Sequence, residues 1–145
     1  MKKKIIIICL ILFAFTLPSC GSGNSTLSEE DYRALAVEFI NEIETLYQLK
    51  QKEFTSLDPI ITLSENLCGI QAPKKYKSVH DKLLSIATPY TDADFSEALY
   101  HYLSAPQKLN TSDHETLKVY KEQYPNAFNP TNVLEEAKTL LAFGD

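Results

Sequence analysis

The sequence predicts an all-α protein, and three features of its residue pattern support this prediction. Apolar residues recur at spacings of three and four along most of residues 28–145, which is the period of an α-helix. No segment alternates convincingly between apolar and polar residues, so no sheet is expected. Proline, glycine and capping residues divide the chain into five or six helical segments. Their short connections favour antiparallel neighbours in a helical bundle.

The first expected helix begins at Ser28 and runs to about Phe54. Ser28 is a suitable N-cap, and the three acidic residues that follow it suit the positive end of the helix dipole. A second helix is expected from an Asp58 N-cap, with Pro59 at its first position, to Gly69. The first helix presents one apolar stripe, formed by Tyr32, Leu35, Phe39, Ile43, Leu46 and Tyr47.

The next three expected helices are also marked by start and stop residues. Pro73 begins the third helix and Pro89 ends it, whereas Asp92 is expected to cap the fourth. Ser112 and Glu115 have the spacing of a capping box, which predicts the start of a fifth helix.

The sixth expected helix begins at the Asn129–Pro130 pair and closes at Gly144. Its apolar face contains Val133, Leu134, Ala137, Leu140 and Leu141. The predicted helical bundle domain therefore occupies residues 28–145.

Residues 1–19 have the composition of an export signal. Lys2, Lys3 and Lys4 give a positive start, and residues 5–17 form an uncharged run of 13 residues. As a helix this run would be about 20 Å long, which is shorter than the roughly 30 Å core of a bilayer. We therefore expect a cleaved signal peptide rather than a membrane-spanning helix.

This run ends at Leu17, Pro18, Ser19 and Cys20, which resemble a bacterial lipobox. The resemblance implies that the Cys20 sulfur receives a diacylglyceryl group and that cleavage makes Cys20 the first residue. Anchoring by two acyl chains is stable where a single chain binds only reversibly. We therefore expect lipid anchoring on the extracytoplasmic face of a bacterial cell membrane, or on an outer membrane. Residues 20–27 then form the lipidated start and a flexible tether.

The expected mature chain of 126 residues is acidic, with eleven basic and nineteen acidic residues and a formal charge of −8. This charge disfavours nucleic acids as partners. Its densest basic stretch, Lys74, Lys75 and Lys77, is expected to be a solvated helical turn. Cys68 is the only thiol left after lipidation, so no intramolecular disulfide can form. We expect Cys68 to pack as a small buried apolar residue.

The sequence contains no recognisable catalytic or cofactor-binding motif. The nucleophile elbow, the zinc-protease helix and the glycine-rich phosphate loop are all missing, so we expect neither an enzyme nor a cofactor. Asp94, Glu97 and His101 share a helix face, but such a face is more often solvated than metal-bound, so no metal site is predicted. His80 lies on an apolar face, where a packed histidine, a ligand-binding group and a pH sensor all remain open. His80 and His101 are the candidate ligand-binding residues.

Tyrosine is the enriched aromatic type, with eight Tyr and no Trp. Tyr100 and Tyr102 point about 200° apart on a helix, so both cannot face the core. Exposed tyrosine suits interfaces because it is large, stiff and amphipathic. Tyr100, Tyr102 and Tyr120 are therefore the predicted partner-binding residues, although a rim of tyrosines around the core would give the same pattern.

The segment from Pro73 to Leu84 carries a Pro-x-x-Tyr-x-x-x-His-x-x-Leu-Leu pattern. Pro73, Tyr76, His80 and the final Leu pair resemble a segment of small uncharacterised helical bacterial lipoproteins. The resemblance implies a helical lipoprotein and carries no activity.

Together these features predict a membrane-anchored, non-enzymatic envelope lipoprotein that binds a protein or peptide partner. One alternative is a carrier or sensor that binds a small ligand or a metal, with His80 and His101 converging on a pocket. Another alternative is a lipoprotein that excludes a phage or toxin.

Overall fold

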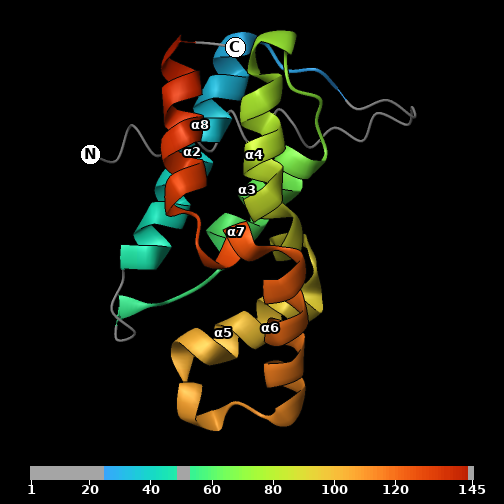
Figure 1. The fold of residues 1–145 in the computed structure, drawn as a ribbon, viewed down its shortest axis with the longest axis vertical. Coiled ribbons are helices and arrows are strands. Elements are labelled where there is room, and N and C mark those ends of the chain that lie inside the picture. Colours follow the sequence, from blue (N-terminus) through green and yellow to red (C-terminus); the bar gives the residue numbers. More distant parts are fainter. Residues whose placement is uncertain (1–24, 49–52, 144–145) are drawn as a thin grey trace.

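The computed structural model describes residues 25–48 and 53–143, and these residues are largely helical (Figure 1). They contain no β-strand, and a single isolated bridge joins Thr26 to Gln71. The all-α prediction is therefore confirmed for this part of the chain. Residues 25–48 and 53–143 contain seven α-helices, namely α2 (Glu29–Gln48), α3 (Asp58–Cys68), α4 (Lys77–Ala87), α5 (Ala93–Ser104), α6 (Thr111–Gln123), α7 (Pro125–Phe128) and α8 (Thr131–Phe143).

The helix count exceeds the expected five or six because of α7, a single turn. Three short 3₁₀ turns also occur, η2 (Lys74–Tyr76), η3 (Thr88–Thr91) and η4 (Pro106–Lys108). The first predicted helix reaches only Gln48 as described, and Phe54 is not helical. The predicted signal peptide (1–19), the lipidated Cys20, most of the tether and Gly144 lie outside the described residues.

Two of the predicted caps are confirmed. The Ser28 hydroxyl accepts a hydrogen bond from the Asp31 amide at 3.1 Å. The Asp92 carboxylate caps α5 by accepting from the amide of Asp94 at 2.9 Å.

The other two predicted caps are each displaced from their expected position. Helix α3 begins at Asp58 itself, so its N-cap is Leu57. The capping box of α6 consists of Asn110 and Asp113, not Ser112 and Glu115. Asn110 is an equally good N-cap residue and has the extended backbone that this position requires, so the helix starts one residue before Ser112.

Helices α2, α3, α4 and α8 pack around a common core, in which α2 and α4 each contact both α3 and α8 (Figure 1). Helix α2 contributes the largest fully buried side chains to this core, including Tyr32, Phe39 and Ile43. Burial of each such side chain contributes about 1.5–3 kcal/mol. No described helix is both long enough and apolar enough to cross a bilayer.

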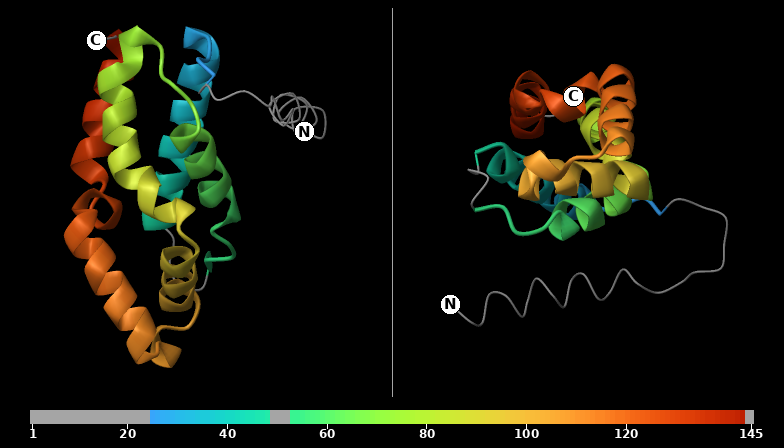
Figure 2. Two further views of the ribbon diagram at one scale, coloured as in Figure 1. Left: turned by 90° about the vertical axis from the view of Figure 1, so that its right-hand side faces the viewer. Right: turned by 90° about the horizontal axis from the view of Figure 1, so that it is seen from below.

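Helices α5 and α6 form a separate pair that packs side by side and extends beyond the other helices (Figures 1 and 2). Turn η3 contacts α3, α4 and α5, and helix α7 contacts α4 and α6. These two short elements therefore join the α5–α6 pair to the remaining helices.

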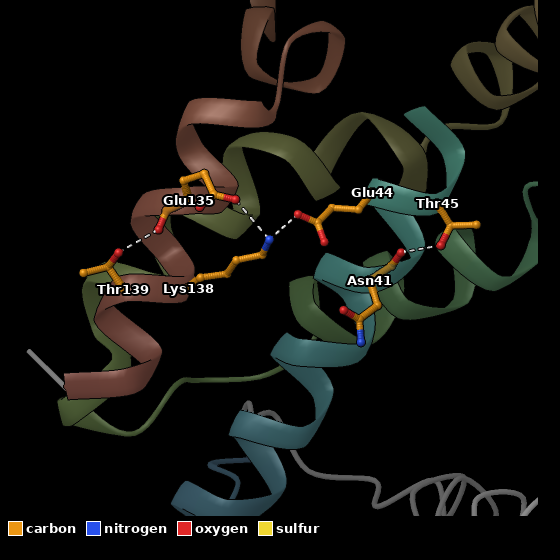
Figure 3. A network of polar contacts seen from close by, with 6 residues as sticks. All are labelled: Asn41, Glu44, Thr45, Glu135, Lys138 and Thr139. Carbon is orange, nitrogen blue, oxygen red and sulfur yellow. Dashed lines mark hydrogen bonds and ion pairs between the residues drawn. The ribbon is translucent and has the colours of Figure 1, made fainter. Parts of the chain in front are cut away.

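An ion pair at the edge of the core links α2 to α8 (Figure 3). The Lys138 ammonium contacts Glu44 of α2, and it also lies 3.0 Å from Glu135 on its own helix. Both carboxylates raise the pKa of Lys138. Because these side chains remain partly exposed, we assign fold stability mainly to the core.

Cys68 is exposed at the end of α3, so the expectation of a buried thiol is wrong. Leu63 and Leu67 take the buried face of this helix. Cys68 directly follows Leu67, so its side chain is rotated about 100° around the helix axis, away from that face.

Replacement of Phe39 by alanine is expected to lower the free energy of unfolding by about 3–5 kcal/mol, because it opens a cavity in the core. Val37→Ala on the same helix is the control, since Val37 is 41% exposed. Urea denaturation followed by circular dichroism measures both values. Equal losses in the two variants would contradict this assignment of the core.

Candidate functional site

A cleft of about 730 Å³ opens between the α5–α6 pair and the C-terminal end of α2. This volume falls within the range of small-molecule sites, roughly 300–1,000 Å³. Its surface is mainly apolar. The residues that line it are Leu46, Tyr47, Tyr90, Leu99, Tyr102, Leu103, His114, Leu117, Lys118, Lys121 and Phe128.

The cleft has two chemically different ends, because α5 and α6 run antiparallel. At one end, the Tyr120 hydroxyl of α6 donates a hydrogen bond to Asp92 at the start of α5. At the other end, His101 of α5 lies 3.2 Å from Asp113 of α6. We call the end near Asp92 the tyrosine end, because Tyr90 lies only two residues before Asp92 and lines the cleft there. The other end, which holds Leu103, is the leucine end.

Tyr90 is held rigidly at the tyrosine end. Its backbone carbonyl accepts a hydrogen bond from the Ser96 hydroxyl at 3.0 Å. Its ring meets Phe95 edge to face, with centroids 5.3 Å apart. Tyr90 lines the cleft but is only 1% exposed, so it forms part of the base.

The Tyr90 hydroxyl is buried and makes no hydrogen bond with any residue in the described part of the chain. The Tyr47 hydroxyl is near enough for the two groups to affect each other's pKa, but the pair falls outside hydrogen-bonding geometry. Tyr47 instead donates to the carbonyl of Ala127. Burial raises the pKa of Tyr47 to about 12 and that of Tyr90 well above its ordinary value. Both phenols are neutral at neutral pH, as tyrosines ordinarily are, and the Tyr47 oxygen is a neighbouring acceptor to which Tyr90 makes no hydrogen bond of normal geometry.

The charged residues that line the cleft, Lys118 and Lys121, are both basic. Neither forms an ion pair with a described residue. They are three residues apart on α6 and so lie on the same side of that helix. Glu115 and Glu122 flank the two lysines along α6 but do not line the cleft, so the charged groups at the cleft surface are these two ammonium groups.

The structure separates the three tyrosines predicted to bind a partner. Tyr102 lines the cleft and is 47% exposed. Tyr100 is 44% exposed but packs on Phe54, with ring centroids 5.7 Å apart. Tyr120 stacks on Tyr124, and its hydrogen bond to Asp92 raises its pKa to about 12. Among the three, only Tyr102 belongs to the cleft.

The two candidate histidines are also placed apart from the cleft. His80 is buried on α4, and its Nδ1 lies 3.2 Å from the Tyr32 hydroxyl. His101 contacts Asp113, as described above, and neither histidine lines the cleft. The described residues contain no group of three or more His, Cys, Asp or Glu that could hold a metal ion, so Asp94, Glu97 and His101 do not form one.

Sequence reasoning missed most of the residues that line the cleft. His114, an exposed residue near the start of α6, also borders the cleft. The spacing of Leu117, Lys118 and Lys121 on one helix side was a usable signal. No sequence signal showed that Tyr47 and Tyr90, which are far apart in the chain, meet at one end.

Replacement of Tyr90 by phenylalanine is expected to change the free energy of unfolding by less than about 0.5 kcal/mol, or to raise it, because the hydroxyl makes no hydrogen bond. Tyr47→Phe is the matched comparison and is expected to cost about 1 kcal/mol, since it leaves the Ala127 carbonyl without its donor. Urea denaturation measures both. A larger loss for Tyr90→Phe than for Tyr47→Phe would show that the Tyr90 hydroxyl has a structural partner.

Stability is expected to fall as the pH drops below about 6.5 because of His80. Burial lowers the pKa of His80, so the unfolded chain binds its proton more readily than the folded chain. His80→Gln is expected to weaken this pH dependence, whereas the exposed His114→Gln is expected to retain it. Urea denaturation at about pH 7.5 and about pH 5.5 tests the difference. If the free energy of unfolding falls by the same amount between these two pH values in wild type and in His80→Gln, the assignment of the pH dependence to His80 is wrong.

Comparisons with known proteins identify no relative of this chain. No protein family matches the chain, and neither a curated protein nor a solved structure resembles it at a significant level. The functional argument therefore depends on the cleft itself.

Proposed function

We propose that this protein is a lipid-anchored envelope lipoprotein that has no enzymatic activity and binds a small, mainly apolar ligand in the cleft between the α5–α6 pair and the C-terminal end of α2. The observation that carries this proposal is the cleft: its volume, its apolar lining and the buried Tyr90 hydroxyl at its base. The protein would act as a carrier or sensor.

The lining of the cleft favours binding over catalysis. It contains no carboxylate, serine or cysteine, and among the described hydrogen bonds none joins His114 to Lys118 or Lys121, so no nucleophile is paired with a base there. A few polar groups within an apolar surface are typical of sites that hold and orient a ligand.

The membrane anchor is inferred from residues 1–20, where a basic start, an apolar run and the Cys20 lipobox occur in order. Ser25 and Thr26 are held against Gln71, so the expected flexible tether shortens to the four residues after Cys20, with a root-mean-square span of roughly 11 Å. A domain tethered in this way stays near the membrane surface, which would favour a ligand that also resides there.

A protein or peptide partner is the second candidate. The exposure of Tyr47 and Tyr102 beside the cleft favours it, because exposed aromatic side chains commonly anchor protein interfaces. A role in excluding a phage or toxin belongs to this second class.

The proposed function can be tested by photolabelling of the full chain in its membranes with a neutral, diazirine-bearing hexadecanol. Adducts are mapped by mass spectrometry of peptides. We expect labelling within residues 93–123 that falls at least about fivefold in Leu103→Trp, which fills the cleft. Val119→Trp, on an exposed part of α6, is the matched control and is expected to label normally. Labelling that is absent from this segment, or equal in both variants, would refute the proposal.

A further inference from the structure

The chemistry of the cleft changes along its length. Leu99 and Leu103 of α5 face Leu117 of α6 across the middle of the cleft and its leucine end. The tyrosine end instead holds a buried hydroxyl, and Lys121 lies near it because Lys121 follows Tyr120, the residue bonded to Asp92. Tyr102 and His114 add polar atoms at the leucine end. A ligand that fills the whole cleft therefore meets leucine side chains in the middle, and a buried hydroxyl together with a lysine at the tyrosine end.

The group at the polar end must accept a hydrogen bond. The Tyr90 hydroxyl is a donor that makes no hydrogen bond with a described residue, and burial keeps it protonated. A buried donor left unsatisfied costs free energy that a ligand acceptor would recover. An alkyl group at this position would leave the donor unsatisfied, so a polar head group fits there better.

The charge of that head group follows from the two lysines. Lys118 and Lys121 line the cleft, no carboxylate does, and neither lysine is neutralised by a described residue. Both lysines are exposed, so their ammonium groups can attract an anionic group at the mouth of the cleft. A hydrogen bond to an ionised acceptor is also stronger than one to a neutral acceptor.

We propose that the cleft binds a single-chain anionic amphiphile, with a carboxylate or phosphate head group at the tyrosine end and an alkyl chain along Leu99, Leu103 and Leu117. The Tyr90 hydroxyl donates to the head group, and Lys118 and Lys121 neutralise it. This inference rests on the proposed function, because it names the class of the small ligand.

Three photoreactive probes of equal chain length test the inference on the full chain in its membranes: hexadecanoic acid, hexadecyl phosphate and the neutral hexadecanol. We expect one or both anions to label residues 93–123 about tenfold more than the alcohol at equal concentration. Stronger labelling by hexadecanoic acid would indicate a free fatty acid as the ligand. Stronger labelling by hexadecyl phosphate would indicate a phosphate-bearing lipid.

Two variants and their controls identify the residues responsible. The double variant Lys118→Gln/Lys121→Gln is expected to lose the preference for anions while it keeps the labelling by the alcohol. Tyr90→Phe is expected to weaken anion labelling several-fold without loss of stability. Lys74→Gln, at an exposed lysine outside the cleft, and Tyr124→Phe are expected to behave as wild type.

The outcomes separate this inference from the proposed function. If all three probes label the cleft equally, the anionic class is wrong and the proposed function stands. If no probe labels the cleft, both fail. If an acidic peptide crosslinks to the cleft and the amphiphiles do not compete with it, the inference is overturned in favour of a protein partner.

Discussion

The packing of Tyr90 in the turn between α4 and α5 is the interaction that joins the two parts of this structure. Pro89 cannot supply an amide donor to continue α4, so the chain tightens into the 3₁₀ turn η3. The turn places the Tyr90 ring against Phe95, and Phe95 in turn packs against Tyr120 and Phe128. The orientation of the α5–α6 pair, and therefore the cleft between this pair and α2, depends on this aromatic cluster.

The same aromatic packing explains why a polar group is buried at the base of the cleft. The Tyr90 ring contributes apolar contact with Phe95, but its hydroxyl must follow the ring into the interior. A phenylalanine at position 90 would make the same ring contacts without burying a hydroxyl that has no hydrogen bond. The Tyr90 hydroxyl therefore adds no described hydrogen bond to the stability of the fold.

Charge distribution separates the cleft from the rest of the surface. On the outside, lysines such as Lys138 are paired with carboxylates of neighbouring helices (Figure 3). Within the cleft, Lys118 and Lys121 have no such partners among the described residues. An acidic protein with this local basic site would repel most anionic surfaces and still admit an anionic group that enters the cleft.

Periodicity and capping chemistry alone determined the all-α class and the approximate extent of most helices, because these depend on residues three and four apart. The displaced cap of α6 shows the limit of such local signals, since Asn110–Asp113 and Ser112–Glu115 present similar patterns only two residues apart. Only the tertiary structure decided which side chains form a site. Tyr47 and Tyr90, which both line the cleft, are separated by two helices in the chain. Contacts between distant segments depend on how the helices pack, and helical spacing in one sequence does not contain that information.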